Sequence, residues 1–477
     1  MFKKLITRCL GVACLTVAFT ACKTPALITR TENRNVPVSF GTSQDSTNTV
    51  NRRWRSFFTD PNLVALIDTA IRNNQELNIT AQEIQITQNE IRARQGEYMP
   101  FVGLRGGAGV DKVGRYTLLG AAEANSEIRP GKEVPEPLPN YMVGAFASWE
   151  VDIWHKLRNA KKAAINRYLA SVEGRNFTIT NLISEIATSY YELLALDNQL
   201  AIVQQNIEIQ NNALRIVRLQ KEATRVTELA VRRFEAQVLN TQNLQYGLQQ
   251  RIIETENRIN FLVGRYPQTV ARNSAAFNTM VPDSIRVGIP SQLLANRPDI
   301  RRAEQELAAA KLDVQVAKAR FYPSLAISAG IGYQAFNPAY FLKTPESLIM
   351  SLAGDLAAPL VNKNAIIATY NSANARQIQA VFNYERTILN AYIEVANQLS
   401  NISNLEKSYS VKTREVQALT QSIDISNTLF NSARAEYTEV LFTQRDALDA
   451  RFDLVETKMR QLTATVNIYR ALGGGWQ

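Results

Sequence analysis

The chain has 477 residues, of which 45% are hydrophobic and 20% charged, and its formal net charge is +10. This balance excludes a disordered chain and a polytopic helical membrane protein, and it leaves a globular or barrel-type protein. Lys and Arg are scattered among Glu and Gln, and no dense basic run with interleaved aromatic residues indicates a nucleic-acid partner.

The start of the chain predicts a secretory signal over residues 1–21. Three basic residues precede an apolar stretch at 10–19, which is too short to span a bilayer. Ala21 then precedes Cys22, as in the lipobox of bacterial lipoproteins, although Phe19 stands where Leu is usual. We expect a covalent lipid on Cys22 and a polar, lipid-anchored lead over 22–58. The alternative is ordinary cleavage near Ala21, with Cys22 as a free thiol.

Cysteine and histidine usage argues against most metal and catalytic sites. Cys9 and Cys14 lie inside the signal and no cysteine follows Cys22, so disulfides and cysteine metal sites are excluded from the mature chain. The single histidine, His155, is insufficient for the usual zinc or histidine-based catalytic sites. The sequence has no phosphate-binding loop and no nucleophile–base pair. We therefore expect a non-enzyme without a metal or a cofactor other than the lipid.

The mature chain reads as two copies of one unit, at 59–270 and 283–477. Aligning Pro100 with Pro323 matches the surrounding segments and places three apolar residues spaced by seven in one copy opposite three in the other. The matched pieces are Leu77, Ile84 and Ile91 with Ile300, Leu307 and Val314; Val226 to Leu229 with Ala435 to Thr438; and Asn260 to Gly264 with Arg470 to Gly474.

Each copy contains two segments in which apolar residues alternate, which predicts strands. These Gly-rich and aromatic segments lie at about 101–110 and 141–149 in the first copy, and at about 325–333 and 348–356 in the second. The Pro-rich segment 129–139 predicts a loop. Each copy thus supplies one β-hairpin.

Each copy ends in a long heptad pattern that predicts a helical hairpin, at about 158–263 and 362–472. Apolar residues recur every seven positions from Ile179 to Leu214 and from Ile388 to Phe430. A helix of about 65 residues would be nearly 100 Å long at about 1.5 Å per residue, so its partner helix must run back along it. The hairpin tips are expected near 224–227 and 433–438.

Four strands cannot close a barrel, whereas three chains would supply about twelve, within the range of outer-membrane barrels. The predicted fold class is an α+β membrane protein with a shared trimeric barrel and a periplasmic α-barrel of coiled-coil helices. The alternative is a soluble sheet packed on the helices. Six aromatic residues near the strand ends fit either an interfacial girdle or a packed core: Tyr98, Phe101, Trp149, Trp154, Phe321 and Tyr322.

Three segments carry a family resemblance: IPSQLLANRPDIRRAE at 289–304, ARFYPSL at 319–325 and RALGGGW at 470–476. With them, the chain resembles the TolC-like outer membrane factor family, in the NodT-type lipoprotein branch that serves resistance-nodulation-division (RND) efflux systems. The resemblance implies a homotrimer in the cell outer membrane with a large periplasmic extension. It also implies a periplasmic adaptor protein and an inner-membrane RND transporter as partners, and passive conduction of small molecules to the exterior, as in multidrug resistance.

The same resemblance implies two sets of functional residues. Glu439 matches the first acidic position that rings the periplasmic gate in the family, whereas Phe442 stands at the second, so aromatic bulk replaces one of the two acidic rings. Either residue could instead be an ordinary helix side chain. The adaptor would dock on the hairpin tips, whose candidates are Thr224, Arg225, Val226, Ala433, Arg434 and Ala435. The alternative is a plain helix-to-helix connection.

Three other functions remain open at this point. A structural periplasmic coiled-coil lipoprotein would explain the heptads and Cys22, but not the paired strand segments. A duct for type I protein secretion would have a similar architecture, although the lipobox and the segment 289–304 favour efflux. Metal-ion efflux is also possible, although the six scattered Met residues form no visible relay for a soft metal.

Overall fold

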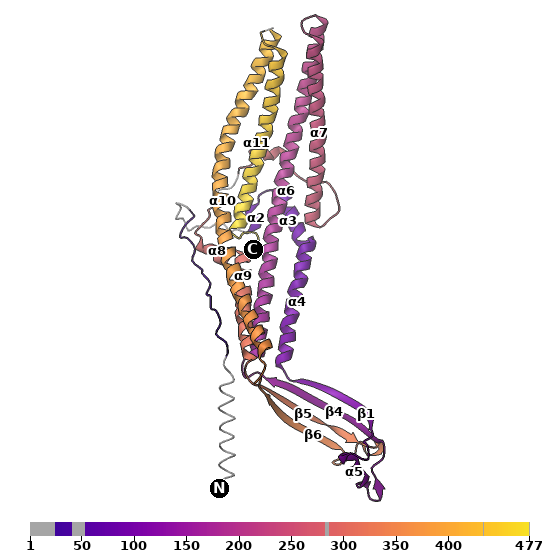
Figure 1. The fold of residues 1–477 in the computed structure, drawn as a ribbon. Helices are drawn as coiled ribbons and strands as arrows, with labels where there is room; N and C mark the ends of the chain where they lie inside the picture. Colours follow the sequence, from indigo (N-terminus) through magenta and orange to yellow (C-terminus); the bar gives the residue numbers. More distant parts are fainter. Residues whose placement is uncertain (1–23, 41–52, 282–285, 433, 477) are drawn as a thin grey trace. The chain divides into compact units, whose positions relative to one another are not determined.

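The computed structural model describes residues 24–40, 53–281, 286–432 and 434–476 (Figure 1). The predicted signal 1–21 and Cys22 lie outside these residues. None of the helices in the described ranges is both long enough and apolar enough to cross a bilayer.

The chain forms two compact units, and each unit takes residues from both sequence copies. The sheet unit comprises Gln85–Leu169 and Gln305–Val381, with residues 24–31. The hairpin unit comprises Glu32–Ile84, Ala170–Glu304 and Phe382–Gln477. The spatial division therefore does not follow the copies 59–270 and 283–477.

One antiparallel sheet in the order β1-β4-β5-β6 contains the four long strands (Figure 1). They are β1 (Phe101–Asp111), β4 (Leu138–Val151), β5 (Ser324–Ala335) and β6 (Leu348–Ala357). Each lies at a segment predicted from alternation, and all four extend beyond at least one predicted end. The two hairpins join through β4 and β5, where Val151 pairs with Leu325 and Tyr141 with Ala335.

The connection between β1 and β4 is more ordered than the sequence indicated. It contains α5 (Leu118–Ala124), β2 (Glu127–Arg129) and β3 (Lys132–Glu133). The expectation that 129–139 is loop throughout is wrong, because Arg129 pairs with Lys132 around a Pro-Gly turn, and β4 begins at Leu138. Gly131 allows this tight turn, since its φ of 75° lies in the left-handed region that favours glycine.

Two antiparallel helix pairs form the long hairpins, α6 (Lys156–Glu222) with α7 (Glu228–Val263), and α10 (Asn364–Asn431) with α11 (Tyr437–Ala471) (Figure 1). The heptad residues Ile179, Ile186 and Leu193 of α6 are buried. In α10, Ile388 and Val395 are buried, but the heptad residues from Ile402 onward are only half-buried in a single chain.

The shorter helices precede a β-hairpin or connect the copies, except η3, which lies between β5 and β6. They are α2 (Trp54–Phe57), α3 (Pro61–Asn73), α4 (Gln75–Tyr98), η2 (Ser274–Thr279), α8 (Ser291–Asn296), α9 (Pro298–Ala319) and η3 (Pro338–Tyr340). The end of the predicted polar lead belongs to the folded core, because Trp54, Phe57 and Phe58 are buried there. Phe57 stacks on Tyr469 with ring centroids 4.0 Å apart.

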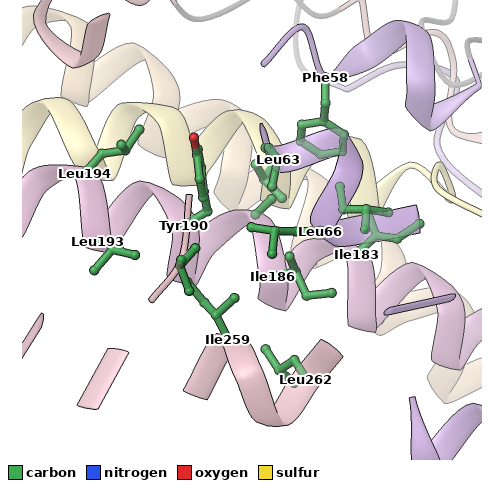
Figure 2. Close-up of a cluster of buried hydrophobic side chains, with 14 of the residues drawn as sticks. Phe58, Leu63, Leu66, Ile183, Ile186, Tyr190, Leu193, Leu194, Ile259 and Leu262 are labelled. Atoms are coloured by element: carbon green, nitrogen blue, oxygen red, sulfur yellow. The ribbon is translucent and has the colours of Figure 1, made fainter. Parts of the chain in front are cut away.

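The main core of the hairpin unit packs α3, α6, α7 and α11 together (Figure 2). Leu63, Ile186 and Ile259 are fully buried around Tyr190. The Tyr190 hydroxyl donates a 2.7 Å hydrogen bond to Asp60, whose other carboxylate oxygen caps the start of α3. Burial and the Asp60 carboxylate raise the pKa of Tyr190, so this phenol stays neutral and keeps donating.

In both copies, a glycine in the left-handed conformation follows the second helix of the hairpin. Gly264 (φ 76°) ends α7, and Gly473 (φ 92°) stands after α11. A Cβ on these glycines would lie 2.5 Å from the carbonyl oxygen of Asn73 and 2.6 Å from that of Asn296, so both positions require glycine. The predicted alignment of 260–264 with 470–474 is therefore wrong by one residue, since Gly264 corresponds to Gly473.

Candidate functional site

Strand register sorts the side chains of the sheet into two faces. Ala147 of β4 lies opposite both Val102 of β1 and Ala329 of β5, and Ala329 lies opposite Leu352 of β6. Directly opposed residues and alternate residues along a strand share a face. The apolar face is thus Val102, Leu104, Gly106, Ala108, Val110, Tyr141, Val143, Ala145, Ala147, Trp149, Leu325, Ile327, Ala329, Ile331, Tyr333, Leu348, Met350, Leu352, Gly354 and Leu356.

The opposite face, here called the polar face, holds every charged side chain of the four strands. These are Arg105, Asp111, Glu150 and Asp355. Most other positions on it are Gly, Ala, Ser, Asn or Gln. The bulky exceptions are Phe101, Leu138, Met142, Phe146 and Ile349. Phe146 lies between Gly103 and Gly330 of the neighbouring strands, and the Arg105 guanidinium lies 5.4 Å from its ring.

The apolar face is uncovered in a single chain. Leu104 is 87% exposed and Leu352 is 81% exposed. A contiguous apolar surface of this kind marks contact with a membrane or another protein. The polar face opposite it indicates that the sheet separates an apolar medium from a polar one, as outer-membrane barrel strands do.

Both edges of the sheet are open within the described part of the chain. β1 pairs only with β4, and β6 pairs only with β5. Unpaired backbone groups cannot be satisfied in a hydrocarbon environment. Each edge can therefore accept a further strand.

The aromatic residues at the strand ends divide between the two predicted roles. Phe321 is buried and packs edge-on against Tyr370, so it belongs to a local core. Phe101 is exposed, and Trp154 is half-exposed and stacks on Tyr322. Trp149 donates its indole N–H to the Tyr98 carbonyl at 3.1 Å, and Trp154 donates to the Pro323 carbonyl at 2.7 Å.

The α6–α7 tip places its three docking candidates in different surroundings. Thr224 follows the end of α6 with a φ of 57°, in the left-handed conformation that favours glycine, and its side chain is exposed. Arg225 is exposed, and its N–H bonds to the Gln220 carbonyl at 2.9 Å. Val226 is half-buried against the core of Phe234 and Val231, so it offers less surface to a partner.

The α10–α11 tip is closed in the same way. The Arg434 N–H bonds to the Leu429 carbonyl at 2.8 Å, which matches the bond made by Arg225. Arg434 is exposed and Ala435 is half-buried, whereas Ala433 lies outside the described residues. Phe430, Tyr437 and Val440 pack in the same cluster as Phe234, so the two tips lie side by side.

The gate candidates share one exposed face at the start of α11. Glu439 stands in the first turn, and Phe442 is exposed one turn later. The Arg445 guanidinium lies 5.1 Å from the Phe442 ring centroid, and Arg445 pairs with Asp446 at 3.2 Å. The arrangement presents a carboxylate, an aromatic ring and a cation in one row.

The tips also differ in charge. Glu228 of α7 is held between Lys221 and Arg232, and the hydrogen bond from Lys221 lowers the pKa of Glu228. Arg225 and Arg233 add exposed cations there, whereas the other tip has the exposed carboxylates Glu436 and Glu439 beside Arg434.

The family model for outer membrane efflux proteins matches residues 66–265 and 289–474, which is most of the chain. The chain belongs to the outer membrane efflux protein family. It is 28% identical over 426 residues to the pyoverdine export outer membrane protein OpmQ of Pseudomonas aeruginosa, covering 89% of this chain and 88% of OpmQ. It is 27% identical over 472 residues to the cation efflux system protein CusC of Escherichia coli, covering 97% and 98%.

The fold is also that of solved outer-membrane channels. The outer-membrane channel OprN superposes with a TM-score of 0.83 at 23% identity, over 95% of this chain and 99% of OprN. This outer membrane efflux protein therefore shares the mixed helical and stranded fold of TolC-like channels, and its relatives are export proteins.

An ion-pair cluster around Arg297 is a further feature of this efflux protein. In the sequence, Arg297 stood out only as part of the segment 289–304. Arg297 is buried and binds Asp299 at 2.7 Å, Glu394 at 2.8 Å and the Ala471 carbonyl at 2.7 Å. Burial opposes the charge, but the bonds to Asp299 and Glu394 raise the pKa of Arg297 above its ordinary value. Arg470 reaches the other oxygen of Glu394 at 2.8 Å. The Arg-Pro-Asp motif was the available signal, but its partners are distant in sequence.

Proposed function

We propose that three copies of this chain close one barrel of about twelve strands in the outer membrane, with their helical hairpins forming a periplasmic tunnel. The observation that carries the proposal is the sorting of the sheet into an apolar face and a polar face between two open edges. In this arrangement the apolar face contacts lipid, the polar face lines the lumen, and each edge pairs with a neighbouring copy. Small molecules pass through passively from periplasm to exterior.

The partners follow from this arrangement. The chain is the outer-membrane component of a tripartite efflux pump whose energy comes from an inner-membrane RND transporter. A periplasmic adaptor docks on the exposed tip residues Thr224, Arg225 and Arg434. The covalent lipid on Cys22 adds an anchor in the outer membrane.

The direct test is conductance. Purified protein added to planar lipid bilayers is expected to give discrete, uniform current steps, because a closed barrel with a polar lining forms a water-filled path. A structural coiled-coil lipoprotein would give none. Deleting the gene is expected to raise sensitivity to small toxic compounds; loss of protein secretion with unchanged sensitivity would assign the channel to type I secretion instead.

The gate proposal makes a separate prediction at Glu439 and Phe442. Three Glu439 carboxylates meeting on one axis would favour the passage of cations, and their mutual repulsion would resist full closure of the periplasmic aperture. The three Phe442 rings would narrow the same aperture. We expect Glu439→Gln to lose most of the cation preference of the bilayer current. Phe442→Ala is expected to enlarge the resting conductance.

Asp449→Asn is the matched control for the gate, since Asp449 is an exposed carboxylate of the same helix about 15 Å beyond Glu439 at about 1.5 Å per residue. The Asp449→Asn variant is expected to change neither the cation preference nor the resting conductance. Equal currents in wild type, Glu439→Gln and Phe442→Ala would place the gate elsewhere.

A further inference from the structure

The long helices of the hairpin unit pack in two separate apolar clusters. The buried residues of the main core end at Val203 on α6 and begin at Leu248 on α7. A second cluster, here called the tip cluster, lies nearer the tips and contains Leu214, Val217, Ala230, Val231, Phe234, Val238 and Val440. Among the described residues, the two clusters have no member in common. A stretch of each helix therefore lies between them.

Polar side chains are buried in the stretch between the two clusters. On α6, Asn206 and Gln210 are buried, and on α7, Thr241 is buried. Gln210 stands seven residues after Val203 and seven before Val217, so it occupies a core position of the heptad pattern. A polar residue at a core heptad position lowers the stability of packed helices. Gln210 thus interrupts the apolar packing of α6.

Helix α11 of the second hairpin has a glutamine in the corresponding stretch. Val440 belongs to the tip cluster and Val455 to the main core, and Gln444 is buried between them. Ala447 and Leu448 are also buried there. The second hairpin is therefore packed along this stretch, but with a polar side chain inside.

Neither glutamine amide forms a hydrogen bond. Nε2 and Oε1 of Gln210 and of Gln444 are buried, and none of these four atoms bonds to a residue that the structure describes. Gln210 is 1% exposed and Gln444 is 3% exposed. Burying an amide without a hydrogen bond costs free energy, whereas burying an apolar side chain gains it. Packing at this level is therefore less stable than packing in the clusters on either side.

The ion pairs that join α6 to α7 fall into the same two groups. Those beside the main core are Glu185–Arg258 (3.0 Å) and Glu192–Arg251 (3.9 Å), and those beside the tip cluster are Arg218–Glu235 (3.5 Å) and Lys221–Glu228 (2.5 Å). In the described part of the chain, no ion pair joins the two helices between these groups. The tip end of the first hairpin thus has its own apolar cluster and its own ion pairs.

We propose that Gln210 and Gln444 form a polar layer that divides the hairpin unit into two cooperative parts. The tip segment, residues 211–240 and 434–443, opens and recloses while the main core stays packed, as local units with fewer buried apolar contacts do. Water satisfies both amides when the helices part at this level, which offsets some of the cost of opening.

The gate candidates and the exposed docking candidates all belong to the tip segment: Glu439, Phe442, Thr224, Arg225 and Arg434. Movement of this segment alone would therefore move the gate without disturbing the main core. The division follows from the contacts within one chain, and only its use in gating rests on the proposed function.

Hydrogen exchange of the full-length protein in detergent, followed by mass spectrometry, tests the division. In the wild type, peptides from 211–240 and 434–443 are expected to exchange together, and faster than main-core peptides from 179–203 and 455–471. Gln210→Met with Gln444→Met replaces each amide by a flexible apolar side chain. This double variant is expected to slow exchange in the tip segment by about tenfold or more, without changing the main core. Gln204→Met is the matched control, because Gln204 is an exposed residue of α6, and it should change neither rate.

A single exchange rate for both parts of the wild type overturns the division, and so does a tip rate that is equal in the wild type and the double variant. Each single variant, Gln210→Met or Gln444→Met, is expected to have an intermediate tip rate, and the two carry the test if the double variant does not fold.

Planar bilayers test the use of the division in gating. The double variant is expected to switch between conductance levels less often than the wild type, because its tip segment opens less often. Equal switching together with slowed exchange overturns the role in gating. Separate exchange rates in a protein that carries no current support the division and overturn the channel, whereas one rate in a conducting protein overturns the division alone.

Discussion

Replacing Leu352 by arginine is expected to prevent stable insertion of the protein into the outer membrane. Leu352 lies near the middle of β6 on the apolar face, 81% exposed in a single chain. An arginine there would face hydrocarbon in each of three subunits, and each such arginine costs about 2–4 kcal/mol near the bilayer midplane. We expect the variant to be lost from the outer-membrane fraction and to lack the heat-dependent gel shift of a folded barrel.

The neighbouring residue provides the matched control. Ala353→Arg places the same side chain on the polar face of the same strand, beside Ser328 of β5. There it would face the lumen, where a charge remains hydrated, so insertion should be preserved and only the ion selectivity of the current should change. Equal insertion of both variants would contradict the assignment of the two faces.

Replacing Arg297 by alanine is expected to destabilise the protein by about 3–5 kcal/mol, because removing one partner of a buried ion pair leaves the other unpaired. Glu394 would retain only the partly exposed Arg470, and the Ala471 carbonyl would lose its donor. The loss is measurable as a lower midpoint of chemical or thermal unfolding in detergent.

Asn74→Ala is the control for Arg297, since Asn74 makes the equivalent bond to the Leu262 carbonyl without any ion pair. Asn74 also accepts a 3.0 Å bond from the Leu77 N–H at the start of α4. Losing these two neutral hydrogen bonds should cost about 2 kcal/mol, less than the loss of Arg297. If both variants unfold at the same midpoint, the Asp299 and Glu394 pairs of Arg297 contribute no stability.

The glycine at the end of each hairpin explains why the signature segments occur together. Arg297 belongs to the segment 289–304, and Gly473 belongs to the segment 470–476. Gly473 lets the chain pass against the Asn296 carbonyl, and Arg297 then binds the carbonyl of Ala471. Two segments that are distant in sequence therefore form one structural junction.

Local periodicity in the sequence was enough to locate the main elements. The alternation at 101–110, 141–149, 325–333 and 348–356 lies within β1, β4, β5 and β6, and the heptads from Ile179 and Ile388 lie within α6 and α10. These patterns are local because a side chain's direction repeats every two residues in a strand and every 3.6 in a helix. The short β2–β3 turn was missed, although Pro130-Gly131 was a turn signal.

Pairing between distant segments was decided only by the tertiary structure. Alternation in each strand could not show that β4 joins β5, nor that one register places Arg105, Asp111, Glu150 and Asp355 on the same face. Phe101 and Phe321 looked alike in sequence, yet one is exposed and the other is buried.

The sequence by itself determined where the long helices and strands lie, that the unit is duplicated, and that one chain has too few strands to close a barrel. The tertiary structure decided which faces are covered and where Arg297 finds its partners. The reason is physical: periodicity is set by neighbours along the chain, whereas burial and ion pairing depend on residues that only folding brings together.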